Sequence, residues 1–138
     1  MQGKYSFQYC ENVTIRSSEI YDCSSKGIQA DDTDGFRVEN CTFHDIGTDQ
    51  YEAGEIFWLS NCTDVNIRNC DVSNNRVMQV FNCRPSAGIE VRETSFARNR
   101  VQLAFFLNDG GGMVMDNCCF EDNEIRRWFQ LESGTVLD

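Results

Sequence analysis

Apolar and polar residues alternate in short stretches along the whole chain, and the stretches recur at a fixed spacing. In 88–111 and 112–135 the matching apolar residues, such as Phe105 and Phe129, are 24 residues apart. Each repeat holds three alternating stretches separated by polar bends. An alternation with period two predicts a β-strand with one buried face, and no helical period is visible. The pattern therefore predicts three short strands per repeat.

The same pattern extends back toward the start of the chain, so nearly all of it is repetitive. The repeats are 12–34, 35–63, 64–87, 88–111 and 112–135. A period of this size is typical of a solenoid, in which each repeat buries its apolar face by stacking on its neighbours. We therefore predict an all-β fold: one domain over residues 1–138, a single-stranded right-handed parallel β-helix of about five coils with three short strands per coil.

Stacking of the repeats predicts columns of identical side chains inside the solenoid. One column is a ladder of phenylalanines, Phe57, Phe81, Phe105 and Phe129. Another is a ladder of asparagines, Asn75, Asn99 and Asn123. We expect these asparagines to bond along the axis and to adopt left-handed backbone at the bends. Strict alternation also predicts that Ile56, Val80 and Ala104 point outward from the phenylalanine strands.

Composition excludes several classes of partner. The net charge is −10, which argues against a nucleic-acid partner because phosphate binding needs a basic surface. No apolar run is long enough to span a bilayer. No signal peptide is visible, and the chain starts and stops inside repeat material. We therefore expect it to be a piece of a longer repeat protein.

The eight cysteines do not follow a zinc-binding spacing. Cys41, Cys70 and Cys118 share one inward column with Ser18 and Thr94. They are therefore interpreted as small core residues. Alternation turns Cys119 outward, where it can oxidise or crosslink two chains.

The recurring segment Val65-Asn66-Ile67-Arg68-Asn69-Cys70-Asp71-Val72 and its counterparts at 36–43 and 113–120 resemble the pectin-lyase-like right-handed β-helix superfamily. The resemblance covers nearly the whole chain. It implies a secreted or cell-surface protein that binds or processes polysaccharide, with the phenylalanine strands flooring the groove. If the protein is an enzyme, the resemblance implies a polysaccharide lyase or a glycoside hydrolase. Asp32-Thr33-Asp34-Gly35 looks like part of a polygalacturonase element, but the remaining elements are missing.

Outward positions on the phenylalanine strands form the candidate polysaccharide-binding surface. Its predicted floor and orienting groups are Trp58, Asn82, Phe106, Trp128 and Gln130. Its predicted rim contains Arg76, Arg100 and Arg126, where a guanidinium can grip the carboxylate of an acidic sugar. These arginines can equally neutralise nearby acidic side chains, and another domain or a second copy of the chain can equally cover the aromatic face.

Candidate catalytic residues gather around an insertion in the second repeat, at 46–55. They are His44, Asp49, Glu52 and Glu55, together with Arg100 on the rim. Two carboxylates across a glycosidic bond can act as acid and base, but a solvated acidic loop explains the same residues. No cofactor is expected. Asp31, Asp32 and Asp34 are candidate calcium ligands, although an ordinary aspartate-rich turn has the same composition.

Two functions follow from the sequence. The first is a module that binds or processes polysaccharide, with an acidic polysaccharide as the expected partner. The second is a non-catalytic structural or protein-interaction module. In that case the aromatic face or the coil ends form a subunit contact, as in a homodimer.

Overall fold

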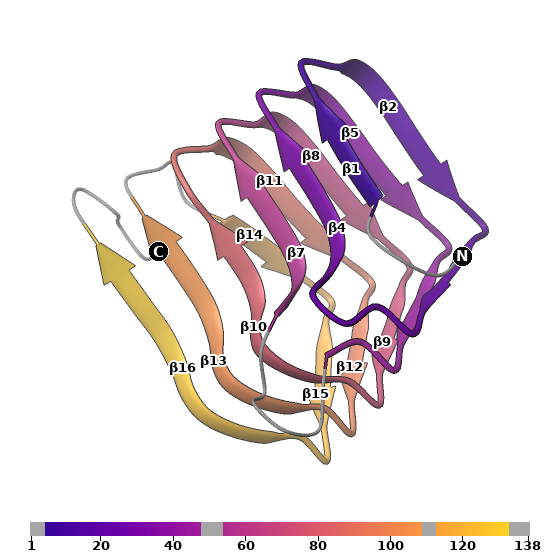
Figure 1. The fold of residues 1–138 in the computed structure, drawn as a ribbon, viewed down its shortest axis with the longest axis vertical. Coiled ribbons are helices and arrows are strands. Elements are labelled where there is room, and N and C mark those ends of the chain that lie inside the picture. The colour runs from indigo at the N-terminus through magenta and orange to yellow at the C-terminus, as the bar shows by residue number, and fades with distance from the viewer. Residues whose placement is uncertain (1–4, 48–53, 109–112, 133–138) are drawn as a thin grey trace.

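The computed structural model describes residues 5–47, 54–108 and 113–132. Within these ranges the chain consists of strands and bends, with no helix and therefore none that could cross a membrane. Strands of equivalent repeats lie side by side and run parallel, so the chain winds through three sheets (Figure 1). The predicted parallel β-solenoid of about five coils is confirmed.

The largest sheet, here called the long sheet, takes one strand from each coil and one from the preceding turn of chain. Its order is β1 (Tyr5–Gln8), β4 (Lys26–Asp31), β7 (Glu55–Ser60), β10 (Arg76–Cys83), β13 (Arg100–Asn108) and β16 (Glu124–Glu132). The last three strands are the longest and curve around the core (Figure 1). This sheet carries the predicted binding surface.

Two smaller sheets close each coil. The middle sheet contains β2 (Glu11–Arg16), β5 (Asp34–Glu39), β8 (Thr63–Arg68), β11 (Ala87–Arg92) and β14 (Met113–Asp116). The short sheet contains β3 (Glu19–Tyr21), β6 (Thr42–His44), β9 (Asp71–Ser73), β12 (Ser95–Ala97) and β15 (Cys119–Glu121). Each coil therefore turns three corners.

The core consists of side chains stacked in register along the solenoid axis. Phe57, Phe81, Phe105 and Phe129 pair in neighbouring strands, and their rings stack at centroid distances of 4.9, 5.5 and 5.2 Å. Phe96 and Phe120 stack in the same way at 4.6 Å. The predicted phenylalanine ladder is confirmed, and it follows from parallel pairing at about 4.8 Å between strands.

At each corner between the middle and short sheets, one residue with positive φ precedes a small or polar side chain that points inward. At the corner between the middle and short sheets the positive-φ residues are Ser17, Asn40, Asn69, Glu93 and Asn117. The residues that follow form the predicted column of Ser18, Cys41, Cys70, Thr94 and Cys118. Their hydroxyl or thiol groups donate to the carbonyl two residues earlier, as Thr94 does to Arg92 at 2.9 Å. This local bond gives the carbonyl a second donor, because the carbonyl of Arg92, for example, also accepts the backbone N–H of Asn69 from the preceding coil at 3.0 Å.

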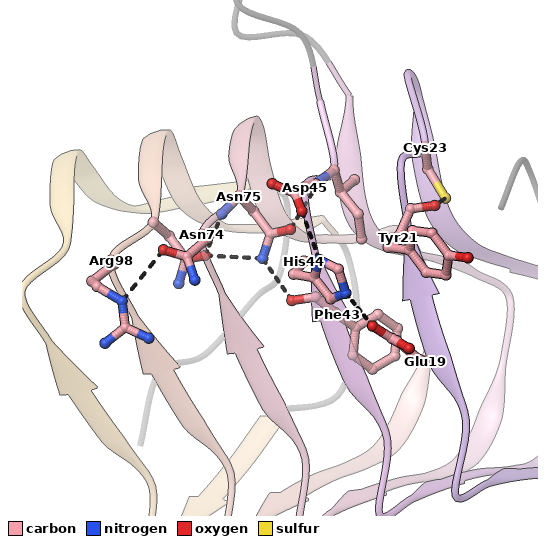
Figure 2. Close-up of polar contacts among 11 residues, drawn as sticks. Glu19, Tyr21, Cys23, Phe43, His44, Asp45, Asn74, Asn75 and Arg98 are labelled. Carbon is pink, nitrogen blue, oxygen red and sulfur yellow. Dashed lines mark hydrogen bonds and ion pairs between the residues drawn. The ribbon is translucent and has the colours of Figure 1, made fainter. Parts of the chain in front are cut away.

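The asparagine ladder lies at the corner between the short and long sheets, and Figure 2 shows Asn75 at this corner. Asn75 Nδ2 donates to Asn99 Oδ1 at 2.9 Å, and Asn99 Nδ2 donates to Asn123 Oδ1 at 3.0 Å. Asn75 Nδ2 also donates to the carbonyl of Phe43 at 3.1 Å. Bonding along the axis is therefore confirmed. The expected left-handed backbone at these residues is wrong, because it belongs to the residues just before them, such as Asn74 and Arg98.

Strict alternation fails where the long sheet bends. Ile56, Val80 and Ala104 are buried in the core next to Phe57, Phe81 and Phe105, which are buried as well. Two consecutive residues therefore face inward in each of these strands, and the prediction that Ile56, Val80 and Ala104 point outward is wrong. The physical reason is the curvature, which turns two neighbouring side chains toward the concave, interior side of the strand.

The cysteines are free thiols, in keeping with their interpretation as small core residues. Cys41 and Cys70 are buried in the predicted column, and Cys118 is half-buried in it. Burial raises the pKa of the Cys83 thiol to about 12, so this thiol stays protonated at neutral pH. Cys119 is exposed, as predicted.

Candidate functional site

One outward column crosses the long sheet beyond its bend. Register pairs Gln29 with Trp58, Trp58 with Asn82, Asn82 with Phe106 and Phe106 with Gln130. We call Trp58, Asn82 and Phe106 the aromatic row. Its two rings lie two coils apart, about 9.6 Å, because parallel strands are spaced by about 4.8 Å. The structure therefore places four of the five predicted floor residues, Trp58, Asn82, Phe106 and Gln130, in a single line.

Trp128, the fifth predicted floor residue, lies in a different column. It stands between the registered pairs Leu103–Arg127 and Phe105–Phe129, so its equivalent in the preceding coil is the buried Ala104. Its ring packs edge-on against Phe120 of the core, with centroids 5.3 Å apart. It remains 45% exposed in the last coil. The side chain of Trp128 therefore points toward the core at the bend, and Trp128 is not part of the aromatic row.

Arg84, at the end of the long-sheet strand β10, lies against the aromatic row. Its backbone N–H donates to the carbonyl of Leu59 at 2.8 Å, which holds the start of the turn on the preceding coil. Its guanidinium carbon is 4.8 Å from the ring centroid of Trp58 and 5.9 Å from that of Phe106. Both distances are within the range of cation–π attraction. Within the described part of the chain, Arg84 makes no ion pair with a carboxylate.

A second cation approaches Trp58 from the preceding coil. Lys26 Nζ is 4.9 Å from the Trp58 ring centroid, but it also lies 3.7 Å from Glu55 Oε2. The indole Nε1–H donates to Asp31 Oδ1 at 3.3 Å, and Gln29 Nε2 donates to Asp31 Oδ2 at 2.8 Å. The orientation of Trp58 is therefore held by several partners, and the charge of Lys26 is balanced locally.

Three polar atoms in or beside the row are buried without a hydrogen-bond partner among the described residues: Gln29 Oε1, Asn82 Oδ1 and Arg84 Nε. Asn82 is only 4% exposed, and its Nδ2 donates to Gln79 Oε1 at 2.7 Å. A buried polar atom with no partner costs roughly 1–3 kcal/mol. The acceptor Asn82 Oδ1 in the row and the donor Arg84 Nε beside it therefore have unused hydrogen-bonding capacity.

The predicted rim arginines lie elsewhere on the long sheet. Arg76 and Arg100 are registered neighbours at the start of β10 and β13, at the opposite end of these strands from Arg84. Arg100 Nε is 3.6 Å from Glu124 Oε2, so this arginine neutralises a nearby acidic side chain, as the alternative interpretation predicts. Arg126 is exposed in the last coil. Arg84 was missed because sequence reasoning considered only the arginines that lead into the strands.

His44 lies on the outer face of the short sheet, away from the aromatic row. Its Nε2 is 2.6 Å from Glu19 Oε1, its Nδ1 is 2.7 Å from Asp45 Oδ2, and its ring stacks on Tyr21 with centroids 5.3 Å apart (Figure 2). Hydrogen bonds to Asp45 and then to Glu19 raise the pKa of His44. Both ring nitrogens are occupied, so His44 can act as a base only by giving up one of these bonds.

The other catalytic candidates do not assemble around His44. Glu55 starts β7 in the long sheet and is paired with Lys26. Asp49 and Glu52 lie outside the described residues. Arg100 is on the long sheet beside Glu124. The carboxylates next to the imidazole are therefore Glu19 and Asp45, which were not among the predicted catalytic residues.

The three candidate calcium ligands have separate hydrogen-bond partners. Asp31 accepts from Trp58 and Gln29, Asp32 accepts from Asn61 at 2.6 Å, and Asp34 accepts from Thr63 at 2.7 Å. Across the described ranges, no group of three histidine, cysteine, aspartate or glutamate residues is arranged to hold a metal ion. The aspartates act here as acceptors between neighbouring coils.

Comparison with known proteins identifies the family of the chain. The family described as the right-handed β-helix region matches residues 2–135. No curated protein and no solved structure matches the chain.

Proposed function

The chain belongs to the right-handed β-helix family, and from that premise we propose that it is a carbohydrate-binding module whose aromatic row takes an acidic polysaccharide. The observation that carries this proposal is the Arg84 guanidinium, which lies against Trp58 and Phe106 and has no carboxylate partner in the described ranges. An aromatic surface with an unpaired cation matches a ligand that has both a ring face and a negative charge.

The row supplies each contact that such a ligand needs. Trp58 and Phe106 offer apolar ring surfaces for the C–H faces of a sugar, and Asn82 offers an acceptor for a hydroxyl group. Arg84 presents a planar set of N–H donors that suits a carboxylate. All four residues are on strands or at a strand end, so their backbone positions are fixed by the sheet before a ligand binds.

Local charge supports an acidic ligand despite the overall charge of −10. Lys26 forms an ion pair with Glu55, whereas Arg84 forms no ion pair with a described residue. A carboxylate placed against Arg84 would gain a charge-assisted hydrogen bond, and the surrounding negative field would weaken rather than abolish it. Binding is expected to weaken as salt is added.

The proposal concerns binding and includes no reaction. His44 keeps both ring nitrogens on carboxylates, and Glu55 is 3.7 Å from Lys26. Neither arrangement provides a free acid and base on the two sides of a glycosidic bond.

Titration calorimetry with oligogalacturonate, alginate and a neutral cello-oligosaccharide tests the proposal. We expect the wild-type chain to bind at least one of the acidic ligands and Trp58→Ala to weaken this binding about tenfold or more, as for the loss of a central aromatic contact. Trp128→Ala is the matched control, because it removes the other tryptophan from outside the row. Binding of no acidic glycan by the wild-type chain, or equal effects of the two substitutions, would contradict the proposal.

An alternative function, a structural or interaction module, is favoured by a different surface. Val114, Trp128, Phe129 and Leu131 in the last coil are each at least 40% exposed. Exposed apolar surface of this kind is typical of a protein contact, such as a second copy of the chain. Light scattering across a dilution series tests this alternative: a monomer at every concentration would argue against self-association.

A further inference from the structure

We propose that Arg84 is a specificity gate for the aromatic row: it covers the surface against neutral sugars and uncovers it for an anionic one. This inference rests on the proposed function, because it concerns the selectivity of the same site. It assigns Arg84 a role beyond simple attraction of a carboxylate.

The position of the guanidinium is the first support. It lies within 4.8 Å of one ring centroid and 5.9 Å of the other, while Trp58 and Phe106 are two coils, or about 9.6 Å, apart. The group must therefore sit between the two rings, over the strand that carries Asn82. This is the space that a sugar chain crossing from Trp58 to Phe106 would occupy.

The unused polar atoms are the second support. With Arg84 in this position, its Nε and the Oδ1 of Asn82 are both buried and have no partner among the described residues. Movement of the guanidinium would expose both atoms to solvent or to a ligand. Cation–π attraction therefore stabilises the guanidinium over the rings, whereas the two missing hydrogen bonds destabilise it there. Because these effects oppose each other, a ligand can displace the guanidinium at a small cost in free energy.

Ligand charge then decides which sugars can open the site. A neutral sugar must displace the guanidinium from the rings and offers only hydroxyl groups in return. A uronate has a carboxylate that can bind the displaced Arg84 guanidinium. The sugar ring of the uronate can then pack on Trp58 and Phe106. The same side chain thus favours the anionic ligand and opposes the neutral one, so selectivity includes a repulsive element.

The decisive experiment compares oligogalacturonate with its methyl ester, which keeps the sugar backbone and removes the charge. Wild type is expected to prefer the acid at least tenfold. Arg84→Ala is expected to weaken acid binding at least tenfold and to strengthen ester binding about threefold or more. Arg92→Ala, on the outer face of the middle sheet, is the matched control and is expected to change neither affinity.

A measurement without ligand tests the covering itself. In a Trp128→Phe background Trp58 is the sole tryptophan, and Arg84→Ala is expected to raise its quenching by acrylamide. Circular dichroism confirms that each variant is folded. Unchanged quenching, or a loss of acid binding with no gain for the ester, would overturn the gate while leaving the proposed binding function intact. Failure of the wild-type chain to bind either glycan would overturn both.

Discussion

At the scale of single residues, the polar side chains of this solenoid interact mainly with neighbouring coils. His44 of β6 reaches Glu19 of β3, Asn61 reaches Asp32, and Asn75 reaches Asn99. Each of these bonds joins residues that are distant in sequence but adjacent along the axis. A polar residue therefore contributes to stability according to what the next coil places beside it.

His44 gives a pH dependence whose sign follows from its raised pKa. Protonation is favoured in the folded chain, so its stabilising effect is fully present below about pH 6.5, the unfolded value, and is lost as the pH rises through the folded pKa. We expect the stability difference between wild type and His44→Gln to be largest in acid and to shrink at alkaline pH. Urea unfolding at several pH values measures this difference.

Because the chain has a single histidine, its imidazole resonance gives an independent check by NMR titration. The midpoint is expected above about 6.5 in wild type and lower in Glu19→Gln, which removes one acceptor. A wild-type midpoint at or below the unfolded value would show that the two carboxylates do not hold the protonated ring.

At the scale of the element, the strands have ordinary extended backbone, whereas the corners contain residues in the unfavourable left-handed backbone conformation. Every coil reverses direction through residues with positive φ, and several of them, including Tyr9, Glu93 and Arg98, are neither glycine nor asparagine. Left-handed backbone costs about 1–2 kcal/mol for such residues. The corners are therefore sites where natural side chains are less stable than glycine would be.

Two glutamates of one coil provide a test of this cost. Glu93 has a φ of 49° at a corner, whereas Glu90 lies within β11, and both form half-exposed ion pairs with arginines. Glu90→Gly is expected to lower the free energy of unfolding by about 0.5–1 kcal/mol, and Glu93→Gly to leave it unchanged or raise it by up to about 1 kcal/mol. Urea unfolding compares them, and an equal loss for the two variants would contradict this account of the corners.

At the scale of the whole molecule, the fold is close to one-dimensional, because each coil contacts only the coils before and after it. A side chain in the middle of a ladder therefore has two stacked neighbours, whereas one in the last coil has a single stacked neighbour. Phe81 is fully buried between Phe57 and Phe105, while Phe129 is 44% exposed and, among the described rings, stacks on Phe105 alone.

Substitution along the phenylalanine ladder should follow this position dependence. Phe81→Ala is expected to lower the free energy of unfolding by about 3–5 kcal/mol, and Phe129→Ala by about half of that or less, because less surface is lost and the site is open to solvent. Equilibrium urea denaturation of the two variants measures the difference. Similar losses at the two positions would indicate that the last coil is packed as tightly as the centre.

Much of the fold was predictable because the strands stack in parallel and in register. Residues at equivalent positions of successive repeats therefore lie above one another in a column of side chains. The phenylalanine ladder, the asparagine ladder and the cysteine column needed no information beyond residues about 24 positions apart. The candidate site was predictable only in part. Trp58, Asn82 and Phe106 share a column, but Trp128 does not. The prediction assumed strict alternation of inward and outward side chains along each strand, and the bend in the long sheet interrupts that alternation.

The amino-acid sequence by itself determined the coil length, the three strands of each coil and the identity of the stacked core residues, since all of these follow from periodic burial. Tertiary structure alone decided that Ile56 and Phe57 both face inward, since curvature sets side-chain direction at the bend. It also decided that Arg84 lies over Trp58 and Phe106. That position depends on three coils meeting at one point, and no spacing within a single repeat contains this information.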